Sequence, residues 1–322
     1  MDFELYPLIF APVLKDKIWG GTKLKDFLGK SITSHTTGES WELSGIKGDI
    51  SIIRDGAYKD TALTWLLEKF PEQVLGNKLH TQFGTDFPLL FKFLDAKDDL
   101  SIQVHPNDEL AKKRHNSFGK TEMWYIMQAD EEAEIIVGFK EKSSPEEYLE
   151  HLENKTLLNI LNRIQVKKGD VFFLETGTIH AIRGGIIIAE IQQTSDITYR
   201  VYDWDRADSE GKPRELHINE ALDAMNYNVT DTRKKYSKDI NQSNPVVHCP
   251  YFTTNYLPLN GYTDVTKNGS SFTVYICTEG SYSITLNNKE YIFTMGDTVL
   301  MPAAARNYTL KGEAVLLEIY IS

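Results

Sequence analysis

The sequence predicts a mainly β protein made of two barrels or sandwiches in series, with short helical insertions. From about residue 86 onward, short runs of β-branched and aromatic residues follow one another, separated by Gly, Asp and Asn turns. Many short strands of this kind are typical of barrels and sandwiches. Strand motifs near the C-terminus also repeat motifs from the middle of the chain, which indicates two copies of one β unit.

Length, composition and charge set the class of protein. The 322 residues are 41% hydrophobic and 11% aromatic, as in a globular chain of roughly two domains. The 35 basic and 46 acidic residues give a net charge of −11, which argues against general affinity for nucleic acid or anionic membranes. A phosphorylated substrate would therefore need cations placed locally in its site.

The ends and the cysteines indicate the compartment. The N-terminal sequence begins with acidic residues, and its short apolar stretch is interrupted by prolines, so we expect neither a signal peptide nor a membrane span. Cys249 and Cys277 show no metal-type spacing and are too few to staple a chain of this size, which favours a reducing cytoplasm. These features leave the oligomeric state unknown.

The predicted elements follow from local patterns. Helical spacing of apolar residues occurs at 61–75, at 214–225 and at 144–164, where Ser144, Pro145 and an acidic first turn mark the helix start. The predicted strands in the middle of the chain read FPLLFKFLDA, LSIQVHP, TEMWYIMQ, AEIIVGF, GDVFFLETGTIHAI and GGIIIAEIQQ.

A change of pattern marks a domain boundary. Residues 236–248 are polar and lack periodicity, and strands resume after them. We therefore place the boundary near residue 237, between a domain of residues 1–237 that carries the helical segments and an all-β domain of residues 238–322.

The internal repeat compares the two domains position by position. GDVFFLETGTIHAI and GDTVLMPAAARNYTL share a Gly-Asp turn, an apolar strand, a corner of small residues and another strand. Ten residues after the aspartate of each turn stand His180 and Asn307, and aligning EMWYIM with FTVYIC sets Glu122 against Phe272. If both domains are copies of one unit, that unit closes without His180 and Glu122, which favours a functional role for both.

The run LSIQVHP carries polar groups on one face of a predicted strand. Because side chains alternate between faces, Ser101, Gln103 and His105 lie opposite three apolar residues. Taken alone, this pattern fits either a half-exposed strand or a pair of ligands.

Four residues on three predicted strands form a candidate metal site: Gln103, His105, Glu122 and His180. A barrel brings inward-facing residues of different strands to one interior point. Two imidazoles, a carboxylate and an amide oxygen suit Zn²⁺, and Mn²⁺, Fe²⁺ and Co²⁺ accept the same donors. The alternative is that the histidines are ordinary core residues with satisfied hydrogen bonds.

Several motifs in order carry a family resemblance. LSIQVHP, GKTEMWYI, GDVFFLETGTIHAI and EIQQTSDITYRVYDWDR resemble the signature blocks of the cupin-type (type I) mannose-6-phosphate isomerases, in particular their short bacterial form. IWGG, GESWELS and FPLLFKFLDAKDDLSIQ extend the match from about residue 18 to 222. The resemblance implies two cupin-type (jelly-roll) β-barrels, the second without metal ligands, and an enzyme of carbohydrate metabolism that interconverts mannose 6-phosphate and fructose 6-phosphate.

The resemblance also implies roles for individual residues. In the family a Q-x-H pair, the glutamate of a K-x-E block and a later histidine bind zinc, and the four candidate ligands match them, with one Zn²⁺ per chain. The family's catalytic lysine, aspartate and arginine match Lys120, Asp196 and Arg200. Two features depart from the longer members: Gly119 stands where they have histidine, and a different block follows the arginine.

The implied reaction moves a proton between C1 and C2 of the sugar through an enediol or enediolate. It requires a base and a centre that stabilises charge on oxygen, and a metal supplies the second. Lys120 is a candidate base, because burial and the adjacent metal charge would depress its pKa. Its alternative is a solvated turn lysine.

Two further charged residues lie in predicted strands. Arg200 shares a face with Thr198 and Tyr202, and it either pairs with Asp196 or stabilises enediolate charge. Glu190 lies in a nearly apolar strand, where an unpaired carboxylate is costly. It is a support for the metal ligands or an alternative base.

The substrate phosphate needs hydrogen-bond donors. Ser101, Lys92 and Arg206 are candidates, and Lys92 is the cation best embedded in a motif. Trp41 and Trp124 are candidate walls of the pocket, or plain core residues. The sequence contains no Gly-rich phosphate loop, nucleotide fingerprint or nucleophile elbow, which excludes the fused guanylyltransferase form of the isomerase.

Two other functions compete with the isomerase. A cupin dioxygenase would resemble a compact H-x-H motif with a glutamate a few residues later, whereas 17 positions separate His105 from Glu122. A catalytically silent sugar-binding cupin would not need Lys120 and Arg200 beside four ligands. Metal content and isomerase activity together distinguish the three.

Overall fold

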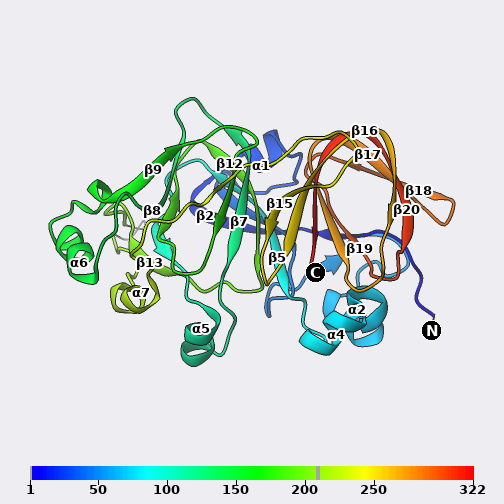
Figure 1. Cartoon of the computed structure of the whole chain (residues 1–322), viewed down its shortest axis with the longest axis horizontal. Coiled ribbons are helices and arrows are strands. Elements are labelled where there is room, and N and C mark those ends of the chain that lie inside the picture. The colour runs from blue at the N-terminus through cyan, green and yellow to red at the C-terminus, as the bar shows by residue number, and fades with distance from the viewer. Residues whose placement is uncertain (1, 208–210) are drawn as a thin grey trace.

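The computed structural model describes residues 2–207 and 211–322. Two β-rich halves lie next to each other along the long axis of the molecule, and short helices flank both (Figure 1). The predicted mainly β fold with two barrels and helical insertions is confirmed. In the part of the chain that the structure describes, no helix is long and apolar enough to cross a membrane.

Two antiparallel sheets pack together in the first half, with apolar side chains such as Leu94, Trp124, Ile135 and Ile182 in one core between them. The order of the seven-stranded sheet is β14 (Arg233–Lys234), β10 (Val171–Leu174), β7 (Glu122–Ala129), β12 (Ile186–Gln193), β5 (Leu89–Ala96), β3 (Thr37–Leu43) and β2 (Val13–Gly21). The order of the five-stranded sheet is β13 (Tyr199–Tyr202), β6 (Ile102–Val104), β11 (His180–Ile182), β8 (Glu134–Phe139) and β9 (Leu161–Gln165).

One eight-stranded sheet forms the second half. Its order is β15 (Asn244–His248), β16 (Thr253–Thr266), β20 (Asn307–Tyr320), β17 (Thr273–Leu286), β19 (Thr298–Met301), β1 (Leu8–Ala11) and β4 (Ile52–Ile53), and β18 (Lys289–Thr294) pairs with β17. Tyr275, Ile284 and Leu310 belong to the apolar core of this half.

Each half receives a strand from a distant part of the chain. The N-terminal strand β1 pairs with β19, with Leu8 opposite Leu300. Its first three residues, Leu8, Ile9 and Phe10, are all buried, which an apolar strand achieves only when both faces are covered. In turn, β14 pairs with β10 of the first half. The boundary near residue 237 stays a prediction.

The helices are short. The pair α2 and α3 occupies the predicted helix at 61–75, with Pro71 at the start of α3, and α7 lies inside the predicted 214–225. The helices are α1 (Lys23–Asp26), α2 (Leu63–Lys69), α3 (Pro71–Leu75), α4 (Asn77–Phe83), α5 (Asp108–His115), α6 (Pro145–Glu153) and α7 (Ile218–Ala224).

The prediction of one helix over 144–164 is wrong in its second part. Ser144 caps α6 by accepting the amide N–H of Glu147 at 3.2 Å, as predicted, but the helix ends at Glu153. Lys155 has φ +56°, which a continuous right-handed helix does not permit. The chain continues as a 3₁₀ turn and then as β9, which pairs with β8.

The sheets bear out the internal repeat. The strand order β3-β5-β12-β7-β10-β14 in the first half corresponds to β15-β16-β20-β17-β19-β1 in the second. The two Gly-Asp turns match in detail: Gly169 and Gly296 have φ of +86° and +91°, a conformation that favours glycine. Asp170 and Asp297 each accept the amide N–H of the residue three positions earlier, at 2.9 and 2.8 Å.

Candidate active site

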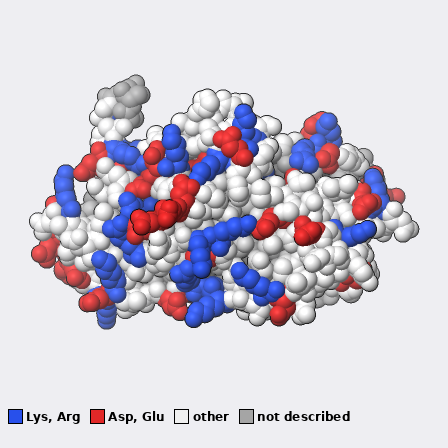
Figure 2. Space-filling view, turned by 90° about the horizontal axis from the view of Figure 1, so that it is seen from above, with Lys and Arg blue, Asp and Glu red and all other residues white. Residues whose placement is uncertain are grey.

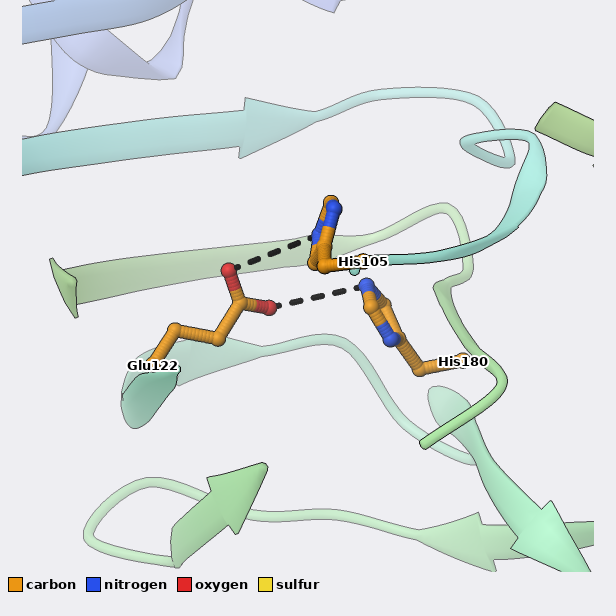
Figure 3. Close-up of side chains that lie close together, drawn as sticks. All are labelled: His105, Glu122 and His180. Atoms are coloured by element: carbon orange, nitrogen blue, oxygen red, sulfur yellow. Dashed lines mark ion pairs between the residues drawn. The ribbon is translucent and has the colours of Figure 1, made fainter. Parts of the chain in front are cut away.

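Three predicted ligands meet in the interior of the first half. His105 follows β6, Glu122 begins β7 and His180 begins β11. The Nε2 atoms of the two histidines lie 3.7 and 3.5 Å from the two carboxylate oxygens of Glu122 (Figure 3). All three side chains are buried, and their ligand atoms lie within 4.8 Å of one another. The cluster has the size of a site for one metal ion.

The strand register brings Gln103 to the same place. In the antiparallel pair of β6 and β11, Gln103 lies opposite His180, and the two side-chain nitrogens are 3.2 Å apart. A 180° turn of the amide, whose two ends have the same shape, directs Oε1 toward the cluster. The structure therefore brings all four predicted ligands together, and strand alternation places Gln103 and His105 on the same side.

Both imidazoles are oriented as metal ligands. Nδ1 of His105 donates to the carbonyl of Ile197 and Nδ1 of His180 donates to the carbonyl of Thr178, each at 2.8 Å. Each Nε2 therefore keeps its lone pair. Burial, with the nearby charge of Lys120, lowers the pKa of His105 well below its ordinary value, and burial lowers the pKa of His180 to about 4. Neutral imidazole is the form that binds metals.

The carboxylate of Glu122 also fits a metal. Burial raises its pKa to about 7, against the opposing effect of Lys120. Its Oε1 atom is buried without a hydrogen-bond partner, which is costly for a polar atom and which a bound cation would relieve.

The strand register corrects the alignment of Glu122 with Phe272. Glu122 lies opposite Leu174 and Thr273 lies opposite Met301 at the same distance from the Gly-Asp turns, so Thr273 is the counterpart of Glu122. Thr273 is buried and Asn307 is exposed. The repeat unit thus folds without these ligands.

A chain of buried charges extends from the cluster. Lys120 pairs with Glu122, and its Nζ lies 3.9 Å from Oε1 of Glu190. Nζ of Lys92 lies 3.2 Å from the same oxygen of Glu190, and Nε1 of Trp124 donates to Oε2 of Glu190 at 3.1 Å. Each charged side chain in this buried row therefore has an opposite charge beside it, as low-dielectric surroundings require.

The pairing determines the protonation states. Burial lowers the pKa of Lys120, but Glu122 and Glu190 outweigh it and the pKa is raised. The predicted depression of the Lys120 pKa assumes the charge of a bound metal and stays a prediction. Burial raises the pKa of Glu190, but Lys120 and Lys92 outweigh it and the pKa is lowered. Without a metal, the pairing favours the ammonium form of Lys120 and the carboxylate form of Glu190.

A cavity of about 360 Å³ opens beside these charges. Its walls combine cations, carboxylates and indole rings, a lining suited to a polar substrate. The proposed catalytic, ligand and substrate residues on its walls are Trp41, Lys92, Ser101, Gln103, Lys120, Glu190, Asp196 and Arg200.

Other cavity residues were missed in the sequence. Lys15 pairs with Asp49, and Nζ of Lys17 lies 3.1 Å from Oε1 of Glu39. Glu39 also accepts from Nε1 of Trp41 at 2.6 Å. The signal was present, because Lys15 and Lys17 alternate in the strand VLKDKIWGG and Glu39 lies in GESWELS. Strand periodicity alone would have placed Lys15 and Lys17 on one strand face, and Glu39 and Trp41 on one face of another strand.

Arg200 has an unusual environment. Its Nη1 donates to the carbonyl of Glu215 at 2.9 Å, and its Nε is buried without a partner. Burial and the nearby Arg214 lower its pKa. Asp196 is exposed at the same cavity, and no ion pair joins it to Arg200 among the described residues. The geometry favours an arginine available to a ligand over a structural ion pair.

Two family models match the chain. The model described as phosphomannose isomerase type I, catalytic domain, matches residues 8–143, and the model described as mannose-6-phosphate isomerase, cupin domain, matches residues 242–321. The mannose-6-phosphate isomerase ManA of Bacillus subtilis (strain 168) is 38% identical over 96% of this chain and 96% of its own length. The mannose-6-phosphate isomerase of Streptococcus mutans is 36% identical over 97% of both chains.

Solved structures show the same relationship. The crystal structure of the mannose 6-phosphate isomerase from Bacillus subtilis has a TM-score of 0.89 at 36% identity and covers 97% of this chain and 99% of its own. A phosphomannose isomerase variant from Salmonella typhimurium, at 17% identity, shares the fold with a TM-score of 0.80 over 98% of this chain and 99% of its own. Together with the site geometry, these matches show that the chain belongs to the type I mannose-6-phosphate isomerase family, a family of metal-dependent isomerases.

Proposed function

We propose that this protein interconverts mannose 6-phosphate and fructose 6-phosphate, with one Zn²⁺ held by Gln103, His105, Glu122 and His180. The observation that carries the proposal is the buried cluster of two neutral imidazoles and a carboxylate beside a charged cavity. The names of the relatives support the substrate. When bound, Zn²⁺ would stabilise negative charge on a substrate oxygen.

Lys120 and Glu190 are the pair that we assign to proton transfer. Both line the cavity, and their charged atoms lie 3.9 Å apart. The lowered pKa of Glu190 keeps it ionised and able to accept the carbon-bound proton. We assign to Lys120 the donation of a proton to a sugar oxygen, supported by its position on the cavity wall and by Glu190, which favours its ammonium form. An adjacent acid and base supply the two proton transfers that an aldose-ketose exchange requires.

The cationic end of the cavity suits the phosphate. Arg200 lacks a carboxylate partner among the described residues, while Arg206 and Arg214 share the single carboxylate of Asp203, each at 2.6 Å. Arg200 and Arg214 line the cavity, whose walls carry six cationic side chains and four carboxylates. Arginine forks match the oxygens of a phosphate. This local excess of positive charge offsets the repulsion between the acidic chain and a dianion.

The remaining predicted residues take supporting roles in the proposal. The ammonium of Lys92 pairs with Glu190 and lies 4.9 Å from the centre of a Trp41 ring, so we assign Lys92 to holding Glu190 rather than to the phosphate. Ser101 is buried on the cavity wall, where its hydroxyl suits a substrate oxygen. Asp196, exposed at the same wall, is the alternative base.

Two further features concern the cellular setting. Cys249 and Cys277 are both free thiols, which supports a reducing compartment such as the cytoplasm. On the face drawn in Figure 2, basic and acidic side chains are interspersed over both halves. This distribution is consistent with a small-molecule substrate rather than a polyanion.

A coupled assay of fructose 6-phosphate formation tests the proposal. Activity should disappear on chelation, return with Zn²⁺, and be absent in Glu122→Gln. For Glu190→Gln we expect kcat to fall by about 10²-fold or more. The matched control is Glu318→Gln, since Glu318 is equally buried in the second half and accepts from Asn255 at 2.9 Å. Metal binding without isomerisation by the wild-type protein would refute the assigned reaction.

A further inference from the structure

The catalytic lysine is carried by a segment without regular secondary structure. Residues 116–121, here called the lysine segment, connect the end of α5 to the start of β7. The metal ligand Glu122 follows the segment directly, and Lys120 is buried although Phe118, two residues earlier, is 42% exposed. A segment of this kind needs contacts other than a helix or sheet to place one buried side chain accurately.

One side-chain pair holds the backbone on both sides of Lys120. Oδ1 of Asp108 accepts the amide N–H of Gly119 at 2.8 Å, and Oε1 of Gln193 accepts the amide N–H of Thr121 at 2.9 Å. The two side chains are joined to each other, because Nε2 of Gln193 donates to Oδ1 of Asp108 at 3.0 Å. The peptide units that flank Lys120 are thus tied to one hydrogen-bonded unit.

Gly119 allows this close approach. A Cβ atom at this position would lie 2.8 Å from the amide nitrogen of Asp108 and 3.0 Å from the carbonyl oxygen of Pro106. Real side chains do not tolerate such contacts with backbone atoms. The lysine segment is therefore packed directly against the start of α5, and its position depends on where Asp108 lies.

The second half of the molecule holds Asp108 in turn. Tyr251, in the turn between β15 and β16, donates its hydroxyl to Oδ2 of Asp108 at 2.7 Å. The two oxygens of one carboxylate therefore connect the second half to the lysine segment. A hydrogen bond to an ionised carboxylate is stronger than one between neutral groups.

We infer that Tyr251, Asp108 and Gln193 are positioning residues, through which the second half fixes Lys120 against Glu122 and Glu190. The catalytic consequence of this positioning rests on the proposed function, because the consequence assumes that Lys120 takes part in proton transfer. The inference gives the second half, which contributes none of the four proposed ligands, a direct contribution to the active site.

Tyr251→Phe tests the catalytic consequence, because it removes the hydroxyl and keeps the ring. We expect kcat to fall about tenfold, the effect of losing one charge-assisted hydrogen bond, with KM and zinc content unchanged. In a Lys120→Met background the same substitution should have no further effect on kcat, since Tyr251 acts through Lys120. An equal loss in both backgrounds, or no loss in the wild type, would overturn the inference.

Tyr236→Phe is the matched control. Tyr236 lies in the connection between the two halves, and its hydroxyl also donates to a first-half carbonyl, that of Gly169. We expect this variant to keep wild-type kcat. A control that loses as much activity as Tyr251→Phe would show that kcat responds to the loss of any tyrosine hydrogen bond near the junction of the halves, and would overturn the specific role of Tyr251.

Amide hydrogen exchange tests the positioning without any assay of activity. In Tyr251→Phe the amides of Gly119 and Thr121 should exchange several-fold faster, while Tyr236→Phe leaves them unchanged. Unchanged exchange in Tyr251→Phe would overturn the inference even if kcat falls. Faster exchange in a protein whose wild type shows no isomerase activity would support the positioning and refute the proposed function instead.

Discussion

Lys92 is the residue for which the sequence and the structure suggest different roles. The sequence proposes it as a phosphate-binding cation, whereas its ammonium lies 3.2 Å from Glu190, with only 7% and 5% of the two side chains exposed. We predict that Lys92→Met destabilises the protein and shifts the acid limb of its pH-activity profile, while KM for mannose 6-phosphate changes little.

The expected loss of unfolding free energy depends on which partners of Glu190 remain after Lys92 is replaced. Removing one partner of a buried ion pair costs about 3–5 kcal/mol. Glu190 keeps Lys120 at 3.9 Å and the Trp124 indole N–H at 3.1 Å, so we expect about half of that cost, roughly 2 kcal/mol of unfolding free energy at neutral pH. A neutral residue at position 190 should relieve the penalty, and the double variant Lys92→Met with Glu190→Gln should recover most of the lost stability.

The pH dependence has a definite sign. Burial raises the pKa of Glu190, but Lys120 and Lys92 outweigh it and lower the pKa. A lowered pKa stabilises the folded state above the unfolded-state pKa, and this contribution is lost as pH falls through the folded-state value. In the Lys92→Met variant Lys120 and the Trp124 indole remain to oppose the effect of burial, but the charge of Lys92 is lost, so the pKa of Glu190 rises. Stability and activity should therefore be lost at a higher pH than in the wild type.

Urea unfolding of both variants at about pH 7 and about pH 5 measures the stability, and kcat and kcat/KM across the same range measure the protonation. A tenfold or greater rise in KM, with unfolding free energy and acid limb unchanged, would refute this reasoning. That result would assign Lys92 to the phosphate, as the sequence suggested.

Three other predictions concern the metal, the phosphate and Gly119. Burial raises the pKa of Glu122 to about 7 in the metal-free site, so zinc must displace a proton from Glu122 below that pH. Zinc affinity measured by chelator competition should therefore fall by up to about tenfold for each pH unit below 7. An affinity that does not change with pH would contradict this prediction. Arg200→Met should raise KM for mannose 6-phosphate by about tenfold or more, with zinc content unchanged, and an unaltered KM would place the phosphate elsewhere. Gly119→Ala, whose Cβ would lie 2.8 Å from the backbone nitrogen of Asp108, should cost about 1–3 kcal/mol in urea unfolding, and a neutral result would show that the lysine segment shifts freely.

The sequence predicted the candidate metal cluster from local strand alternation together with the family resemblance of motifs on three strands. Alternation placed Gln103 and His105 on one face, and the structure has them on the same side, next to His180. The repeat set Glu122 and His180 apart from counterparts that carry neither a carboxylate nor an imidazole, and both halves show the same strand order. The sequence alignment missed the counterpart of Glu122 by one residue, because the register makes it Thr273 rather than Phe272. The Gly-Asp turns and the start of α6 could also be predicted from the sequence, since turns and caps involve residues a few positions apart.

Local patterns failed where distant residues decide. The helical periodicity of 144–164 was real, but pairing with β8 drew its last part into β9. The same spacing fits a buried strand and a buried helix, so only the partner determines which one forms. The N-terminal strand β1 found its partner in β19, almost the whole chain away.

The sequence by itself predicted the mainly β class, the repeat and a set of donor residues suited to a metal. Only the tertiary structure decided which charges are neighbours. It paired Lys120 with two carboxylates, which raise its pKa in the absence of a metal. It also engaged Lys92 with Glu190 and brought Tyr251 of the second half to Asp108. Coulomb energies depend on distances of a few ångströms between atoms from distant positions, and strand packing determines those distances.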